Sequence, residues 1–284
     1  MSCTVCKTLN CTNKPLLARL PDLTSEQTTI SQNNGDAMTT LSGPTNDLLH
    51  KFPNLYEKVF TVSTAPTCIE LYQSLRGSLP RTALDIGSGP GRELADLAEM
   101  SIDCVGVDFV PMMVEYAQKN YPKVEFIQGD MREFRLGRKF DMITILGACI
   151  NYMLDNADLE KALTTVLTHS HEDTVVIVEP YNTTSFVGTN TPPLEYVIPD
   201  GEFKAVGNAA YEWSQKEQLI SRVRTWRFSE GQDDIQDTYK QRLYFAKELQ
   251  YFFEKNGFSV VDTVEHQQSK IYNKSLFLLA TPSN

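Results

Sequence analysis

The chain has 284 residues, of which 41% are hydrophobic and 22% are charged, and this composition excludes a collagen-like fibre and a wholly disordered chain. Its formal net charge of −10 argues against a broad nucleic-acid-binding surface, because such binding depends on many lysine and arginine contacts to phosphates. No apolar stretch approaches the roughly 20 residues that span a bilayer, and the N-terminus lacks the apolar core of a secretory signal. We therefore expect a cytoplasmic protein without nucleic-acid or membrane partners.

Residues 1–45 are rich in threonine, serine, asparagine and glutamine and show no sustained hydrophobic period, which predicts a disordered or loosely ordered tail. Three of the six cysteines, Cys3, Cys6 and Cys11, lie in this tail. No histidine or second cysteine pair follows them at a spacing typical of zinc, so we expect no metal site.

Residues 46–79 are predicted to form helices that precede the main domain. Apolar residues recur at intervals of three and four over NDLLHKFPNLYEKVF and again over APTCIELYQSLRGSLP. Pro53 interrupts the first of these segments, which predicts a break in the helix there.

The remainder of the domain, which we place at residues 46–284 as a whole, has the pattern of an α/β fold. Between residues 80 and 180, short apolar runs such as TALDIG, VGVDF, MITIL and VVIV alternate with amphipathic segments. This alternation predicts a parallel sheet with helices on both faces, as in Rossmann-like folds. The segment 200–245 reads instead as an antiparallel β insertion, and one helix and two more strands follow it.

A glycine-rich loop follows the first predicted strand, in ALDIGSGPGRE. Gly87, Gly89 and Gly91 alternate behind Asp85, with Ser88 inside the loop. Such a strand-to-helix turn exposes backbone N–H groups at the edge of the sheet where ligands of α/β folds bind. A dinucleotide fingerprint would place its third glycine one position later, and no P-loop motif is present. We therefore expect a ligand without a pyrophosphate.

Two further carboxylates end the following strands. Asp108 ends VGVDF, where a carboxylate can accept both hydroxyls of a ribose. Asp130 ends the next strand in FIQGDMREF, where it can accept from an adenine amino group while the main chain at Met131 meets the neighbouring ring nitrogen. These positions together describe a slot for an adenosine.

The sequence resembles the class I S-adenosylmethionine-dependent methyltransferases over residues 80–180. Four segments carry the resemblance in the family's order: DIGSGPG, VGVDFVPMMVEYA, QGDMREF and FDMITILGACINYM. The resemblance implies S-adenosyl-L-methionine as cofactor and a role for residues around each of its parts. By this resemblance the methionine part is lined by Asp85, Gly87 and Gly89, the ribose is held by Asp108, the adenine is flanked by Phe109 and Met113 beside Asp130 and Met131, and Leu146 offers main chain to the amino-acid end.

A narrower resemblance concerns the small-molecule N-methyltransferases. QGDMREFRLGRKFDMIT, VVIVEPY and the antiparallel insertion are similar to the amino-sugar N,N-dimethyltransferases and, more loosely, to the glycine N-methyltransferases. The former have an N-terminal helix of the form YDxxY. Here LYEKVF supplies Tyr56, which we count among the cofactor-binding residues, and Phe60 replaces the second tyrosine.

Methyl transfer from a sulfonium needs mainly an in-line arrangement, so few catalytic residues are expected. An amine acceptor must lose a proton, and we select Tyr152 and Glu179, after the fourth and fifth strands, as catalytic candidates. The favoured hypothesis is methyl transfer to a small-molecule acceptor, with an amine nitrogen preferred. The same fold also allows an O- or carboxyl-methyltransferase, a protein methyltransferase, or a non-methylating catalyst or regulator that binds the cofactor. The oligomeric state is not indicated.

Overall fold

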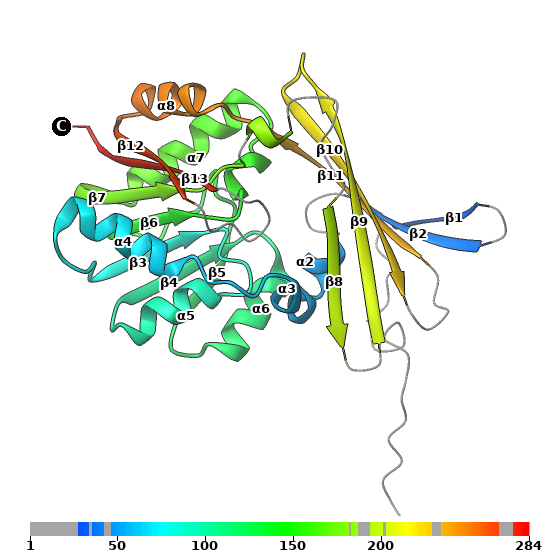
Figure 1. The fold of residues 1–284 in the computed structure, drawn as a ribbon. Coiled ribbons are helices and arrows are strands. Elements are labelled where there is room, and N and C mark those ends of the chain that lie inside the picture. Colours follow the sequence, from blue (N-terminus) through cyan, green and yellow to red (C-terminus); the bar gives the residue numbers. More distant parts are fainter. Residues whose placement is uncertain are drawn as a thin grey trace, which may run out of the picture.

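The computed structural model describes residues 28–33, 36–42, 47–181, 183–186, 194–200, 203–228, 234–266 and 275–283. Within these residues the strands form two sheets that lie side by side (Figure 1). One sheet is mainly parallel and has helices on both faces, and the other is mainly antiparallel. This arrangement confirms the α/β fold class with an antiparallel insertion.

The larger sheet has the strand order β12-β13-β7-β6-β3-β4-β5. Its strands β3 to β7 run parallel, and β13 and β12 are added antiparallel at one edge. The central strands are apolar on both faces because helices cover both of them. The strands are β3 (Thr82–Ile86), β4 (Asp103–Asp108), β5 (Glu125–Gln128), β6 (Phe140–Ile145), β7 (Ser170–Val178), β12 (Phe258–His266) and β13 (Ser275–Pro282).

Two groups of helices cover the two faces of this sheet. The helices α4, α5 and α6 pack on one face, and α7 and α8 pack on the other. Helix α4 ends at the left-handed Gly77, and α7 begins at Asp155, whose side chain accepts from Asp158 N. The helices are α4 (Ala65–Arg76), α5 (Arg92–Glu99), α6 (Pro111–Asn120), α7 (Asn156–Thr168) and α8 (Ala246–Lys255), with short 3-10 turns η1 (Cys149–Tyr152) and η2 (Thr183–Ser185).

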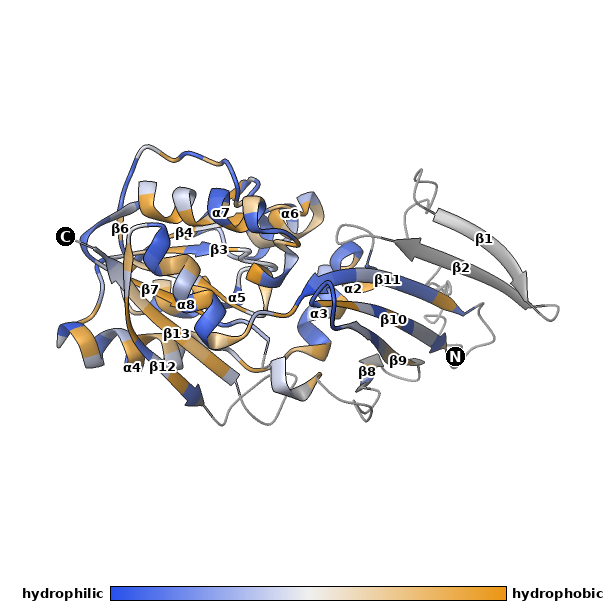
Figure 2. Ribbon diagram, turned by 90° about the horizontal axis from the view of Figure 1, so that it is seen from above, coloured by the Kyte–Doolittle hydropathy of each residue, from blue (hydrophilic) through white to orange (hydrophobic). Residues whose placement is uncertain are grey.

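The second sheet has the order β1-β2-β11-β10-β9-β8. Side chains alternate across β10 and β11, so that every second residue is buried on the face toward the larger sheet. Figure 2 shows many hydrophilic residues along these two strands, in contrast to β7 and β13. The strands are β8 (Leu194–Asp200), β9 (Phe203–Ser214), β10 (Leu219–Phe228) and β11 (Ile235–Arg242).

The structure differs in part from the disordered or loosely ordered tail predicted over residues 1–45. Strands β1 (Thr28–Asn33) and β2 (Asp36–Ser42) pair with each other, and β2 pairs in parallel with β11. The residues between them, Asn34-Gly35, are the dipeptide most typical of two-residue hairpin loops. The polar composition of the tail outweighed this local signal in the prediction. Residues 1–27, including the three cysteines of the tail, lie outside the described residues.

The short helices α2 (Leu48–Lys51) and α3 (Pro53–Val59) lie between the two sheets (Figure 1). They separate at Pro53 as predicted, because proline donates no backbone hydrogen bond and favours a helix start. Helix α3 contacts β8 on one side and α6 on the other. These helices therefore form a wall that joins the antiparallel sheet to the larger sheet.

In the part of the chain that the structure describes, no helix has the length and apolar character needed to cross a membrane.

Candidate active site

The three glycines of the loop between β3 and α5 have different surroundings. All three adopt left-handed backbone angles, with φ of 82° at Gly87, 53° at Gly89 and 92° at Gly91. A Cβ at Gly91 would lie 2.5 Å from Cζ of Phe126, and one at Gly87 would lie 2.4 Å from Sγ of Cys149. A Cβ at Gly89 would meet no atom within 4 Å. Gly91 thus serves packing, whereas Gly89 leaves its main chain open to a ligand.

A cavity of about 500 Å³ extends from this loop to the buried face of the antiparallel sheet. It is bounded by the carboxyl ends of β3 and β4, by the wall of α2 and α3, and by β10 and β11. Ligands of α/β folds bind at this edge of the sheet. The cavity lining includes nine of the residues selected from the sequence: Tyr56, Gly87, Gly89, Asp108, Phe109, Met113, Asp130, Met131 and Tyr152.

Asp108 is buried at the end of β4, and both of its oxygens are engaged. Its Oδ2 accepts from Gly89 N at 2.7 Å and its Oδ1 accepts from Val110 N at 2.8 Å. Burial raises the pKa of this carboxyl, and the two backbone hydrogen bonds oppose that rise. Each carboxylate oxygen has two lone-pair directions, so the group retains room for two ribose hydroxyls. Asp108 therefore fastens the glycine loop and also presents an acceptor to the cavity.

Asp130 lies at the cavity but is held mainly by Arg132. Arg132 Nε donates to Asp130 Oδ1 at 2.9 Å, and Arg132 Nη2 donates to Asp130 Oδ2 at 2.5 Å. Hydrogen bonding from Arg132 lowers the pKa of the Asp130 carboxyl. Arg132 also donates to Asp158 at the start of α7. The pairing fixes Asp130 as an ionised acceptor in the cavity wall.

Glu57 fastens the wall helix α3 to the end of helix α6. Glu57 Oε2 accepts from the Tyr116 hydroxyl at 2.7 Å, and Oε1 accepts from the Tyr121 hydroxyl at 2.8 Å. Arg92 reaches the same helix, where it donates to the carbonyl oxygens of Phe60 and Glu57. These contacts hold the neighbouring Tyr56 against the cavity, with its ring centroid 4.6 Å from that of Phe60.

The other five selected residues are not among those that line the cavity. Asp85 is buried and accepts from the Thr144 hydroxyl at 2.7 Å, which places it beneath the loop. Ser88 is also buried, and Gly91 packs against Phe126. Leu146 is buried among the residues packed with α4, α5 and α6. The fifth, Glu179, is the catalytic candidate at the end of β7.

Glu179 contacts the protein through both carboxylate oxygens. Its Oε2 accepts from Gly147 N at 3.0 Å and its Oε1 accepts from the Ser275 hydroxyl at 2.5 Å. These bonds join the loop after β6 to the first residue of β13. The geometry favours an anchoring role for Glu179 over the catalytic role expected from the sequence, because its oxygens point to the loop and the neighbouring strand.

Tyr152, the other catalytic candidate, lines the cavity from η1. Its ring centroid lies 5.7 Å from that of Tyr239 on β11, so η1 and the antiparallel sheet bring two tyrosine rings together at the cavity. Burial raises the pKa of the Tyr152 phenol well above its usual value, and the neighbouring Tyr239 adds to the rise. Tyr152 is therefore a protonated hydrogen-bond donor near neutral pH, not a base.

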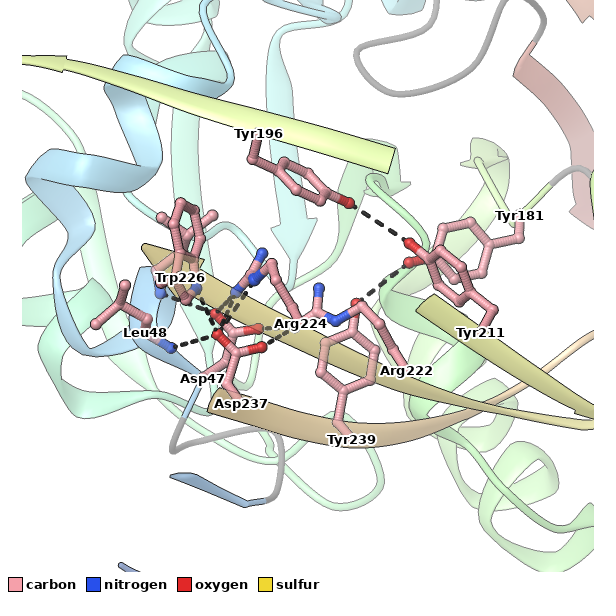
Figure 3. A network of polar contacts seen from close by, with 11 residues as sticks. Asp47, Leu48, Tyr181, Tyr196, Tyr211, Arg222, Arg224, Trp226, Asp237 and Tyr239 are labelled. Carbon is pink, nitrogen blue, oxygen red and sulfur yellow. Dashed lines mark hydrogen bonds and ion pairs between the residues drawn. The ribbon is translucent and has the colours of Figure 1, made fainter. Parts of the chain in front are cut away.

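A buried charge cluster, which the sequence analysis missed, forms the far wall of the cavity (Figure 3). We define it as Asp47, Arg222, Arg224 and Asp237. Arg222 donates to Asp47 and, at 2.9 Å, to Asp237 Oδ1. Arg224 Nη2 lies 2.6 Å from Asp47 Oδ1 and 2.8 Å from Asp237 Oδ2. The two positive and two negative charges compensate each other, as burial of charge requires.

Further contacts fix the cluster to both the sheet and the wall helices. Trp226 Nε1 donates to Asp237 Oδ2 at 2.9 Å, and Leu48 N donates to the same atom at 3.3 Å. Burial acts to raise the pKa of the Asp47 carboxyl, but attraction from Arg224 and Arg222 outweighs it and holds the pKa well below its usual range. A sequence signal was present, because the alternation in Arg-Val-Arg-Thr-Trp puts both arginines on the buried face with Trp226.

The glycine loop, the strand-end carboxylate and the cavity between the sheets define an α/β protein with the class I methyltransferase fold. Residues 83–172 match the family described as "Methyltransferase domain". This match agrees with the resemblance seen in the sequence.

Curated relatives are similar over part of their length. The dTDP-3-amino-3,4,6-trideoxy-alpha-D-glucopyranose N,N-dimethyltransferase of Streptomyces venezuelae is 33% identical over 98 residues, which are 34% of this chain and 41% of that protein. The dTDP-3-amino-3,6-dideoxy-alpha-D-glucopyranose N,N-dimethyltransferase of Streptomyces fradiae is 30% identical over 145 residues, which are 49% of this chain and 57% of that protein. The chain thus spans about half the length of the curated relatives it matches.

Solved structures extend the likeness to most of the fold. Streptomyces venezuelae DesVI has a TM-score of 0.69 at 19% identity, covering 81% of this chain and 98% of that chain. CalS10, an amino pentose methyltransferase from Micromonospora echinaspora solved with bound S-adenosylmethionine, has a TM-score of 0.67 at 19% identity, covering 77% and 90%. These likenesses confirm the fold class.

The residues present fit S-adenosylmethionine. Gly89, in the loop after β3, leaves open space where a side chain would stand. Asp108, at the end of the neighbouring strand β4, presents a buried carboxylate. Among the described residues, no group of three or more histidine, cysteine, aspartate or glutamate side chains is arranged to hold a metal ion.

Replacement of Gly89 by leucine is expected to weaken binding of S-adenosylhomocysteine by at least about 100-fold, because the side chain would fill the space beside the loop. Isothermal titration calorimetry measures this affinity. Gly137→Leu is the matched control, since Gly137 is also left-handed, with φ of 68°, has open space around it and lies away from the cavity. Equal affinities in the two variants would contradict a ligand role for the loop.

Proposed function

We propose that this protein transfers a methyl group from S-adenosyl-L-methionine to an amine nitrogen of a small hydroxylated molecule, such as an amino sugar. The observation that carries the proposal is the single cavity that joins the glycine loop and Asp108 to the inner face of the antiparallel sheet. One end suits an adenosine and the other has room for an acceptor. The names of the two Streptomyces relatives described above support an amine acceptor. A cytoplasmic location stays a prediction.

The bound donor supplies an already activated methyl group on a sulfonium. In the transfer the nitrogen-carbon bond forms as the sulfur-carbon bond breaks, sulfur keeps the electron pair, and the amine loses a proton to water. The chain's task is positioning, because an in-line arrangement of the reacting atoms lowers the barrier. The loop at Gly89 and the carboxylate of Asp108 orient the donor end. The wall of α2 and α3 limits the entry of water.

Tyr152 is placed to orient the acceptor. Burial raises the pKa of its phenol, so the phenol keeps its proton at neutral pH. It can therefore donate a hydrogen bond to an oxygen or to an amine nitrogen of the bound molecule. We expect the acceptor to bind as an ammonium and to react as the free amine. The rate should therefore rise with pH up to the pKa of the bound amine, without a contribution from Tyr152 as a base.

Tyr152→Phe is expected to lower kcat/KM for the amine about 2- to 10-fold, the scale of one neutral hydrogen bond, and to leave the pH at half-maximal rate unchanged. Rates measured between pH 6 and 10 in both proteins check this. Loss of the acidic limb in the variant would instead identify Tyr152 as the proton acceptor.

A radiolabelled methyl donor tests the function directly. The full chain is incubated with the donor and with panels of amines, carboxylic acids, alcohols and peptides, and the products are separated. Label on amines supports the proposal. Label confined to acids, alcohols or peptides would assign another methyl acceptor, and tight cofactor binding without label on any compound would indicate a non-methylating protein.

A further inference from the structure

Two polar atoms in the wall of the cavity have no hydrogen-bond partner among the described residues. They are Nε of Arg222 and Oε1 of Gln241, and both atoms are buried. Arg222 is 4% exposed and Gln241 is 1% exposed, and both residues line the cavity. Buried polar groups are nearly always paired, so an unpaired donor and an unpaired acceptor in one cavity wall indicate a missing polar partner.

The two atoms come from neighbouring positions of the same sheet face. Arg222 on β10 lies opposite Tyr239 on β11, and Gln241 follows Tyr239 by two residues on that face. Diagonal neighbours of this kind lie about 7–8 Å apart in an antiparallel pair. The guanidinium carbon of Arg222 lies 3.6 Å from the centre of the Tyr239 ring, which fixes its orientation. A small molecule against this face can therefore meet a donor of fixed orientation on Arg222 and an acceptor on Gln241.

The charges around the cavity exclude one kind of ligand. The described lining contains three arginines and five aspartates. Arg222 and Arg224 are each paired with Asp47 and Asp237, and Arg132 is paired with Asp130 and Asp158. No guanidinium of this lining is left over for a phosphate. A diphosphate would bring two more negative charges to a site where carboxylates already exceed arginines.

We propose that the methyl acceptor is a phosphate-free amine, with an oxygen that accepts from Arg222 Nε and a hydroxyl that donates to Gln241 Oε1. This inference rests on the proposed function and narrows its substrate class. It separates this protein from the two Streptomyces relatives described above, whose names specify dTDP-linked amino sugars. A neutral or cationic hydroxylated amine satisfies both unpaired atoms without adding negative charge.

Calorimetry with the full chain saturated with S-adenosylhomocysteine tests the inference independently of turnover. The two probes are the methyl glycoside of 3-amino-3,6-dideoxyglucose and the dTDP-linked form of the same sugar. We expect the glycoside to bind at least about tenfold more tightly. Tighter binding of the dTDP-linked sugar, or no binding of the glycoside, would overturn the inference. The proposed function fails separately, if no amine of the labelling panel gains a methyl group.

Gln241→Met tests the anchoring atom, because it keeps the side-chain length and removes Oε1. It should weaken binding of the glycoside about tenfold and leave the affinity for S-adenosylhomocysteine unchanged. Gln236→Met is the matched control, since Gln236 lies on the same strand but on the other face. Unchanged glycoside affinity in Gln241→Met would remove Gln241 from the site.

Arg222→Lys provides a second variant that keeps the positive charge but has no Nε. This variant should weaken binding of the glycoside by a similar factor. A melting temperature close to that of the unmodified chain would show that the fold is retained. If the variant does not fold, the result for Gln241→Met decides the question by itself.

Discussion

Replacement of Asp237 by asparagine is expected to lower the free energy of unfolding by about 3 to 5 kcal/mol, the usual effect of breaking a buried ion pair on one side. Asp237 is fully buried and accepts from Arg222, Arg224, Trp226 and the backbone of Leu48. Asparagine would leave two buried guanidinium groups facing a single carboxylate. Its amide nitrogen would also meet donors on the side where an oxygen had accepted. The melting temperature should fall by about 10 °C.

Asp234→Asn is the matched control for this measurement. Asp234 lies three residues earlier and pairs with Arg227 at 3.7 Å, but the two side chains are 41% and 63% exposed. Exposed pairs contribute about 0 to 1 kcal/mol. Adding Arg224→Met to Asp237→Asn should restore part of the lost stability, because one uncompensated charge is removed. A fall of the same size in both single variants would contradict the role of burial.

The same cluster predicts a dependence of stability on pH. The pKa of Asp47 is lower in the folded chain than in the unfolded chain, where it is near its usual value of about 3.9. Its contribution is therefore fully present above about pH 4 and is lost as the pH falls toward the folded-state pKa. Urea unfolding between pH 3 and pH 7 should show this loss, and Asp47→Asn should reduce it.

The parallel sheet and the glycine loop were predictable because their signals are local. Short apolar runs indicate strands that are buried on both faces. Alternating glycines indicate a loop whose backbone adopts left-handed angles. Asp108 could be selected for the same reason, because it is the last residue of the apolar run that follows the glycine loop along the chain. The hairpin of β1 and β2 also had a local signal, but the surrounding polar composition was given more weight.

The charge cluster could not be predicted because its members come from distant parts of the chain. Asp47 and Arg222 are separated by 175 positions, and only the folded arrangement of the wall helix against β10 brings them together. For Glu179 the limit was different. Its position at the end of β7 is as expected, but the choice between the cavity and the contacts with Gly147 and Ser275 depends on side-chain direction.

Asp108→Asn is expected to weaken binding of S-adenosylhomocysteine about 10- to 100-fold, the effect of losing a hydrogen bond to a charged group. A strand-end carboxylate that met only the ligand could be replaced without loss of stability in the unliganded chain. The structure changes that expectation, because Asp108 accepts from Gly89 N and Val110 N. Asparagine has one oxygen for these two donors, so its amide nitrogen must face one of them. We now expect unfolding to become easier by about 1 to 3 kcal/mol as well.

Because both effects are expected, affinity and stability alone do not separate ligand contact from loop fastening. A thermodynamic cycle does, when the side chain and the ribose hydroxyls are removed separately and together. Calorimetry would compare S-adenosylhomocysteine with its 2′,3′-dideoxy analogue in the unmodified chain and in Asp108→Asn. If Asp108 holds the diol, the unmodified chain discriminates strongly between the ligands and the variant discriminates much less. If the variant keeps the full discrimination, Asp108 acts only through Gly89 and the loop, because a residue that does not touch the diol loses nothing when the hydroxyls are absent.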